Sequence, residues 1–204
     1  MNTYDAIVIG VSAGGMRALT TILPELPKNF SLPVMIVQHI APDSDGYLAV
    51  HLNRLSRIQV KEAADKQTIQ PATAYLAPPS YHLLVEYDRV LCLTVDEPVH
   101  YARPSIDVLF ETAADVYGER LIGVILTGAN SDGSQGLKRI QQYGGLTIVQ
   151  NPATAESPFM PQSAIEAAKP DHIVDLAAIG PLLRTFHNDG HSSPTSDENR
   201  SALR

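Results

Sequence analysis

Apolar runs of strand length alternate with amphipathic stretches of helical length along most of this 204-residue chain. The strand candidates are residues 5–9, 33–38, 58–62, 74–77, 121–126, 146–150 and 172–175, and the helix candidates are residues 14–23, 45–56, 105–117, 133–143, 161–168 and 178–186. This alternation is typical of a mainly parallel sheet that is covered by helices on both faces. The sequence therefore predicts an α/β doubly wound fold.

Two segments depart from the alternation. Residues 82–86 and 90–94 flank the turn-like Tyr87-Asp88-Arg89, and they predict an antiparallel hairpin inserted into the fold. Residues 187–204 are polar, rich in Ser and Asp and without periodicity, which predicts a disordered tail. Since neither a repeat nor a linker divides the rest, we expect residues 1–186 to form one domain.

The bulk composition excludes several classes of protein. A net charge of −7, without a basic stripe, argues against a nucleic-acid partner, because phosphate binding needs clustered Lys and Arg. The single cysteine, Cys92, lies in an apolar run and cannot form an intramolecular disulfide. No apolar run is long enough to span a membrane, and the first residues lack the blocks of a signal peptide. These features predict a cytoplasmic protein that is not embedded in the membrane.

The segment Ile7-Val8-Ile9-Gly10-Val11-Ser12-Ala13-Gly14-Gly15 is an apolar strand that runs directly into G-x-S-x-G and then into a helix. Such a turn exposes the Ser12 hydroxyl beside backbone N–H groups, which suits a nucleophile. It also suits a turn that binds a phosphate, although the dinucleotide-binding pattern G-x-G-x-x-G would have glycine at position 12. The local pattern leaves both interpretations open.

Two further polar residues follow predicted strands. His39 comes after PVMIVQ, and Asp132 comes after LIGVILTG. Because functional groups of a parallel sheet gather beyond the carboxyl ends of its strands, Ser12, His39 and Asp132 are expected at one edge. Each also has a purely structural explanation: Ser12 could satisfy backbone donors at the turn, His39 could be a hydrogen-bonded loop histidine, and Asp132 could be a helix cap or a first-turn acid that the helix dipole favours.

A serine, a histidine and an aspartate at one edge match the needs of nucleophilic catalysis. A serine hydroxyl needs a neutral imidazole as its base, and a carboxylate fixes the tautomer of that imidazole. The chain order Ser, His, Asp differs from the orders of the familiar serine hydrolases. An α/β-hydrolase would instead need His172 or His187 as the base. The histidines outside this set show no metal-ligand spacing, so we expect neither a metal nor another cofactor.

Several separated blocks of the chain, in the same order, resemble the catalytic domain of the bacterial chemotaxis protein-glutamate methylesterases. The resemblance spans about residues 6–183 and rests on IGVSAGG, VQHIAP, VKEAADKQTIQPATAYLAPPSYHL, RPSIDVLFETAA, GVILTGANSDGSQGL, GGLTIVQNPATA and MPQSAIEA. It implies that Ser12 is the nucleophile, that His39 is the base and that Asp132 orients the base. It also implies an oxyanion hole built from the backbone amides of Ala13 and Ala129.

The resemblance further implies a substrate and a reaction. The substrate would be a glutamyl methyl ester on the cytoplasmic helices of a methylated receptor, which is hydrolysed with release of methanol. Deamidation of glutamine by the same chemistry is a related activity of the family.

Two local departures from the family concern the turn and the loop. Some members carry Thr where this chain has Ala13, and their T-G-M-G-N-D-G stretch here reads Thr127-Gly128-Ala129-Asn130-Ser131-Asp132-Gly133. If Ala129 supplies a backbone amide, its different side chain need not abolish that donor.

A third departure concerns regulation. Full-length members of the family carry an N-terminal receiver domain, whereas this chain enters its first strand within its first residues. We therefore expect a free-standing enzyme or a fragment. Regulation by a separate protein is one possibility that the sequence leaves open. The alternative function is a non-catalytic module that binds a nucleotide or phosphate at the Ser12 turn. Gln38-His39 counts against that alternative, because an acidic ribose ligand is expected at the end of the second strand.

Overall fold

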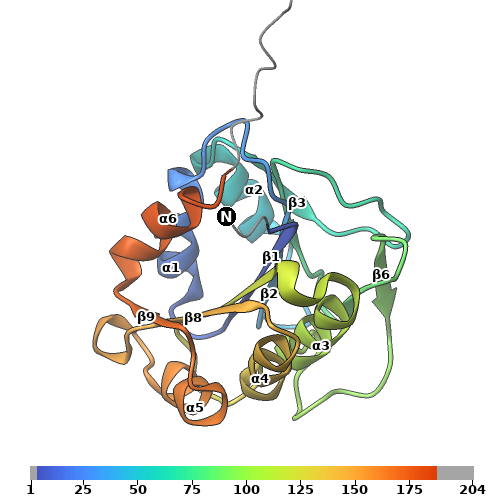
Figure 1. The fold of residues 1–204 in the computed structure, drawn as a ribbon. Coiled ribbons are helices and arrows are strands. Elements are labelled where there is room, and N and C mark those ends of the chain that lie inside the picture. Colours follow the sequence, from blue (N-terminus) through green and yellow to red (C-terminus); the bar gives the residue numbers. More distant parts are fainter. Residues whose placement is uncertain (1–3, 188–204) are drawn as a thin grey trace, which may run out of the picture.

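A computed structural model describes residues 4–187 of the chain and shows one parallel sheet between two layers of helices (Figure 1). The strands of this sheet are β1 (Ala6–Val11), β2 (Val34–Gln38), β3 (Gln59–Glu62), β4 (Thr73–Leu76), β7 (Leu121–Ile125), β8 (Leu146–Gln150) and β9 (His172–Val174). The helices are α1 (Gly15–Ile22), α2 (Tyr47–Leu55), α3 (Ile106–Tyr117), α4 (Ser134–Gln142), α5 (Phe159–Ala168) and α6 (Leu176–Arg184). The expected α/β doubly wound fold is confirmed.

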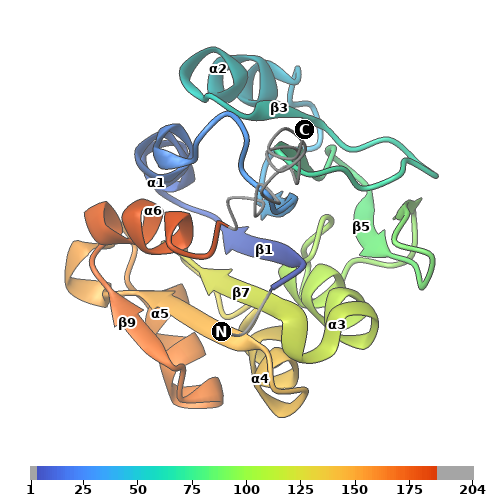
Figure 2. The ribbon, with the colours of Figure 1, turned by 45° about the horizontal axis from the view of Figure 1, so that its top comes forward.

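The core consists of two layers, one on each face of the sheet. Along β1, Ala6 and Val8 face one layer, whereas Ile7, Ile9 and Val11 face the other. This alternation follows from the two-residue period of a strand, and the fully apolar β1 is buried on both faces. Helices α3, α4 and α5 cover the first face, and α1, α2 and α6 cover the second (Figures 1 and 2).

The strand order places a topological switch point at the centre of the sheet. The order is β3-β4-β2-β1-β7-β8-β9, and every neighbouring pair is parallel. From β1, the chain builds outward through β2 on one side and later through β7 on the other. Crevices that bind ligands form at such points, beyond the carboxyl ends of the strands. The segments that follow β1, β2 and β7 meet at this place.

The inserted hairpin is also present. Strands β5 (His82–Val85) and β6 (Leu91–Thr94) pair antiparallel as a separate two-stranded sheet. Leu83, Val85 and Leu91 are buried in the same core layer as α3, so the hairpin packs against that helix. Its position beside α3 is visible in Figure 2.

The expected tail of residues 187–204 lies outside the described residues, except for His187. That residue accepts a hydrogen bond from the backbone N–H of Ser31 at 2.9 Å, and its ring lies 5.7 Å from the ring of Phe30. Within residues 4–187, no helix combines the length and apolar character that crossing a membrane requires.

Gly10 is predicted to be essential for the close approach of α3 to the end of β1. A Cβ atom at this position would lie 2.3 Å from Cγ2 of Ile106, the first residue of α3. We expect Gly10→Ala to lower the free energy of unfolding by about 1–3 kcal/mol, because the added methyl group overpacks this contact. Urea unfolding measures the effect. On an Ile106→Ala background the same change should cost less, and an equal cost on both backgrounds would contradict the packing argument.

Candidate active site

Ser12 lies directly after β1, in a turn that its backbone hydrogen bonds fix. Its N–H donates to the carbonyl of Thr127 at 2.9 Å, and its own carbonyl accepts the N–H of Gly15 at 2.9 Å. Gly14 has a φ of 81°, and a Cβ there would lie 2.7 Å from Cβ of Glu156. Both the left-handed backbone and the lack of space therefore require glycine at position 14.

The turn opens into a cavity of about 690 Å³. The cavity combines polar and apolar side chains from the turn, from α1 and from the segment between β2 and α2. Its lining residues are Ser12, Gly14, Gly15, Met16, Arg17, Thr20, Gln38, Ile40, Ser44, Asp45, Tyr47, Leu48 and Glu156. Ser12 is half-buried, and no hydrogen bond to its hydroxyl is present within residues 4–187. Ser12 thus lines a space that a ligand can enter.

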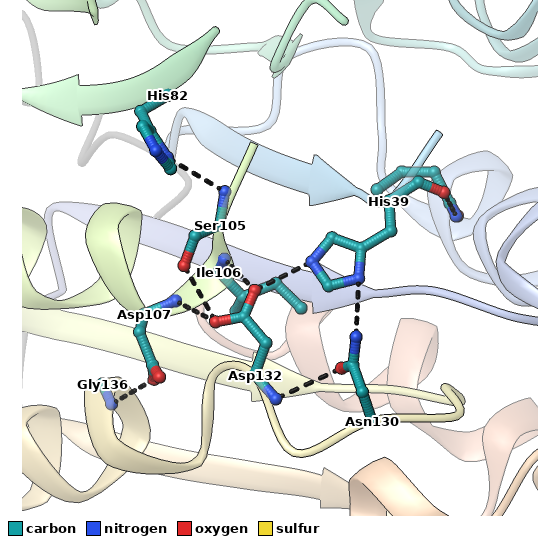
Figure 3. A network of polar contacts seen from close by, with 9 residues as sticks. His39, His82, Ser105, Ile106, Asp107, Asn130, Asp132 and Gly136 are labelled. Carbon is teal, nitrogen blue, oxygen red and sulfur yellow. Dashed lines mark hydrogen bonds and ion pairs between the residues drawn. The ribbon is translucent and has the colours of Figure 1, made fainter. Parts of the chain in front are cut away.

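His39 follows β2 and contacts Asp132. Its backbone N–H donates to the carbonyl of Val11 at 3.0 Å, which extends the β1–β2 pairing and brings position 39 beside position 12. Nε2 of the imidazole lies 2.8 Å from Oδ2 of Asp132 (Figure 3). The His39 side chain is 14% exposed and that of Asp132 is fully buried, so little water weakens this contact.

Asp132 accepts four hydrogen bonds from two other parts of the chain (Figure 3). Oδ1 accepts the Ser105 hydroxyl at 2.9 Å and the Asp107 N–H at 3.0 Å, while Oδ2 accepts the Ile106 N–H at 2.7 Å and Nε2 of His39. The N-cap residue of α3 is Ser105, yet its side chain does not cap the helix. Asp132 takes over this role from a distant loop, where its charge also meets the positive end of the helix dipole.

These contacts determine the ionisation of Asp132. Burial alone would raise the pKa of its carboxyl group, since it penalises the charged form. The hydrogen bonds from His39, Ile106 and Asp107 outweigh burial, and they hold the pKa below its ordinary value of 3.8. Asp132 is therefore an anion at neutral pH, although its side chain is inaccessible to water.

Asp107 makes the reverse connection from α3 to α4. Its Oδ1 accepts the N–H of Gly136, in the first turn of α4, at 2.7 Å. Burial raises the pKa of Asp107 to about 6, and the nearby charge of Asp132 adds to this effect while the Gly136 hydrogen bond opposes it. The two helices thus exchange caps, because Asp132 precedes α4 and caps α3, whereas Asp107 lies in α3 and caps α4.

Asn130 contacts both the imidazole of His39 and the backbone of Asp132. Its Oδ1 accepts the backbone N–H of Asp132 at 3.2 Å, and its Nδ2 lies 3.3 Å from Nδ1 of His39 (Figure 3). An ionised carboxylate only accepts hydrogen bonds and a carboxamide nitrogen only donates them. The arrangement therefore assigns the proton of a neutral His39 to Nε2 and leaves Nδ1 with a free electron pair that Asn130 contacts.

Two of the three residues that the sequence predicts as a triad touch each other. His39 and Asp132 are in direct contact, and Ser12 follows the neighbouring strand without a hydrogen bond to His39 within the described residues. The backbone N–H groups of Ala13 and Ala129 have no intramolecular acceptor in residues 4–187. Both segments adjoin, since the Thr127 hydroxyl donates to the carbonyl of Ala13 at 2.8 Å.

The histidines that an α/β-hydrolase would need lie elsewhere. His172 is exposed and begins β9, whereas Ser12 follows the end of β1. Because the strands are parallel, His172 lies at the opposite end of the sheet from Ser12. His187 contacts Ser31, which precedes β2, and is likewise at that opposite end. Neither residue can serve a nucleophile at position 12.

Three polar residues of this site were not predicted from the sequence: Gln38, Ser105 and Asn130. The spacing Asn130-x-Asp132 is compatible with an Asx turn, which is a weak signal for the Asn130 contact. Ser105 was recognisable only as a helix start, and its hydroxyl reaches a residue 27 positions later. Within residues 4–187, no group of three or more His, Cys, Asp or Glu side chains has an arrangement that could hold a metal ion.

Comparisons with known proteins relate the chain to one family. The family model described as CheB methylesterase matches residues 7–183. The solved structure of the Thermotoga maritima CheB methylesterase catalytic domain superposes with a TM-score of 0.86 at 35% identity, over 90% of this chain and 99% of that chain.

Two relatives show how much of longer proteins the chain spans. A Leptospira interrogans protein, whose name pairs protein-glutamate methylesterase with protein-glutamine glutaminase, is 55% identical over 88% of this chain and 93% of its own length. Protein-glutamate methylesterase/protein-glutamine glutaminase 1 of Carboxydothermus hydrogenoformans is 39% identical over 87% of this chain and 54% of its own length. The chain thus spans about half of the second relative.

The fold and the site define a doubly wound α/β protein with a serine turn and with a histidine paired to a buried aspartate at the switch point of its sheet. Within this class, the chain belongs to the CheB methylesterase family.

The raised pKa of Asp107 predicts how stability depends on pH. Between about pH 4 and pH 6 the folded protein holds a proton that the unfolded chain has lost, so ionisation of Asp107 costs stability as the pH rises. A shift from 3.8 to about 6 corresponds to about 3 kcal/mol. Asp107→Asn keeps an acceptor for Gly136, and we expect the variant to be more stable than wild type above pH 6 by up to this amount.

Urea unfolding between pH 4 and pH 8 tests this prediction. The advantage of Asp107→Asn should shrink steadily from pH 6 towards pH 4, as the pH approaches the ordinary carboxyl pKa of 3.8 and the unfolded chain also takes up the proton. Asp88→Asn, at an exposed turn position, is the control and should show no such dependence. A variant whose stability relative to wild type falls as the pH rises would contradict the prediction, because it would show that Asp107 stabilises the fold as an anion.

Proposed function

We propose that this protein is a serine hydrolase that removes methyl esters from glutamate side chains of receptor-type proteins. One observation carries the proposal: the imidazole of His39 is paired with the buried anion of Asp132 at the strand end next to Ser12. The names of the relatives support the same chemistry. A Ser-His-Asp triad is the arrangement that makes a serine hydroxyl nucleophilic at neutral pH.

The first half of the reaction is attack by Ser12. Nδ1 of His39 holds the free electron pair, so it accepts the proton as the Ser12 oxygen forms a bond to the ester carbonyl carbon. Asn130 contacts this nitrogen in the structure, so its carboxamide must give way to the Ser12 hydroxyl. Asp132 stabilises the imidazolium that results, because its charge lies 2.8 Å from Nε2.

The tetrahedral intermediate places a negative charge on the former carbonyl oxygen. The backbone N–H groups of Ala13 and Ala129 are the proposed donors for this oxyanion, since neither has an acceptor within residues 4–187. The imidazolium then returns its proton to the departing methoxide, which leaves as methanol. Water attacks the acyl-enzyme with His39 again as base, and this second attack releases the glutamate carboxylate and regenerates Ser12.

The same chemistry hydrolyses the primary amide of glutamine, with ammonia as the leaving group. We therefore include glutamine deamidation in the proposal, in line with the second activity that the relatives' names carry. The proposed partners are the cytoplasmic helices of a methylated receptor, which places the protein in the cytoplasm and in chemotactic signalling. The proposed catalytic domain comprises residues 1–186.

Asp132→Asn is predicted to abolish most of the esterase activity. A carboxamide has one acceptor and one donor end, so one of its ends must oppose N–H or O–H donors that the carboxylate accepts. We expect methanol release from a methylated receptor fragment to fall about 10³- to 10⁴-fold. Ser12→Ala should reduce the rate to background, whereas Asp88→Asn should leave it unchanged.

A phosphonate that labels activated serines distinguishes this proposal from a nucleotide-binding module. Labelling confined to Ser12, and lost in Ser12→Ala, is the expected result. Nucleotide binding at the turn, without methanol release and without labelling, would overturn the proposed function.

A further inference from the structure

Gln38 is a buried polar residue in the wall of the cavity, and the reaction described above does not use it. It is the last residue of β2 and is only 8% exposed. Its Nε2 donates to the carbonyl of Ser12 at 2.9 Å and to the carbonyl of His39 at 2.9 Å. The orientation of the carboxamide is therefore defined, because the reverse orientation would place Oε1 against two carbonyl oxygens.

These two hydrogen bonds continue the sheet beyond its last regular pair. Val11 pairs with Gln38 in the β1–β2 register, and the N–H of His39 donates to Val11. One residue further along, Ser12 turns towards β7 and donates its N–H to Thr127. Backbone pairing between β1 and β2 therefore ends with the N–H of His39. The side chain of Gln38 links the two carbonyls at the point where the backbones separate.

The surroundings leave Gln38 little freedom to move. A Cβ atom on Gly15 would lie 1.7 Å from Oε1 of Gln38, so glycine at position 15 provides the space that the carboxamide occupies. Oε1 is buried and has no hydrogen-bond partner within residues 4–187. An unsatisfied buried acceptor costs free energy. This cost accompanies the two hydrogen bonds that Nε2 donates to the carbonyls of Ser12 and His39.

We propose that Gln38 is a positioning residue for the esterase reaction: its carboxamide sets the separation of the Ser12 turn and the His39 loop. The inference rests on the proposed function, because the distance that Gln38 sets is the one across which Ser12 transfers its proton to His39. Misplacing reacting groups by about 1 Å can reduce a rate about 10²-fold. Gln38 acts in this role through the two backbones, whose carbonyls its Nε2 holds.

Two substitutions of similar size separate this role from simple packing. Gln38→Met removes the donor at every pH. Gln38→Glu replaces it with a carboxyl group that can donate a hydrogen bond only when it is protonated, and whose carboxylate repels the two carbonyl oxygens. Gln142, which is exposed at the end of α4, provides the matched controls Gln142→Met and Gln142→Glu.

The measurement is the rate at which a serine-directed phosphonate labels Ser12 between pH 5 and pH 9, with thermal unfolding recorded in parallel. We expect Gln38→Met to label about 10- to 10²-fold more slowly than wild type, by a factor that is independent of pH. For Gln38→Glu we expect the rate to fall relative to wild type as the pH rises, because the new carboxyl group loses its donor when it ionises. Both Gln142 variants should follow the wild-type profile.

The outcomes separate the two proposals. If wild type labels at Ser12 and folded Gln38→Met and Gln38→Glu label within twofold of it at every pH, the positioning role is overturned and the proposed function stands. If wild type itself is not labelled at Ser12, the proposed function fails.

A measurement on the wild-type protein covers the case in which a Gln38 variant does not fold. Both carboxamide protons of Gln38 should exchange with solvent much more slowly than those of Gln142 in the same NMR spectrum. Equal exchange rates would contradict the two hydrogen bonds, and with them the inference.

Discussion

The hydrogen bonds that the Asp132 carboxylate accepts are the interactions on which the rest of this site depends. A buried anion is tolerated only when donors satisfy it, and here the donors come from His39 and from the first residues of α3. The same contacts cap α3 and keep Asp132 ionised, so that the fold is stabilised and the imidazole is oriented by one group. Losing the carboxylate would leave unpaired donors on both α3 and His39.

The helix that satisfies Asp132 is itself held by close packing. Ile106, the first residue of α3, lies against Gly10 at the end of β1 and against Gly133 beside Asp132, positions where a Cβ atom would approach it to 2.3 Å and 2.5 Å. The reciprocal cap from Asp107 to Gly136 ties α4 to the same place. A site assembled from loops is thereby fixed by rigid elements, as catalytic geometry requires. This arrangement buries a second carboxyl group, Asp107, near the first. The burial costs free energy when Asp107 is ionised, as its raised pKa shows.

The sequence predicts the fold well because hydrophobic periodicity and short connections are local properties. The runs around β1, β2 and β7 are buried on both faces, and a parallel sheet necessarily brings the residues that follow them to one edge, which explains why His39 and Asp132 were found. Ser105 and Gln38 could not be assigned roles in this way, since their contacts join segments that only tertiary packing brings together. Asn130 was equally hidden, because the contact of its Nδ2 with His39 depends on a loop conformation rather than on periodicity.

Asp132, held by the N-terminus of α3, fixes His39 as the tautomer that carries its proton on Nε2 and leaves Nδ1 free for the proposed role as base. Long-range proton–nitrogen NMR of the imidazole, recorded on wild-type protein at a pH where His39 is neutral, tests this claim directly. The expected result is a protonated Nε2, whose hydrogen-bonded proton is shifted downfield, together with an unprotonated Nδ1. A ring protonated on Nδ1, or one that exchanges rapidly between both tautomers, would contradict it.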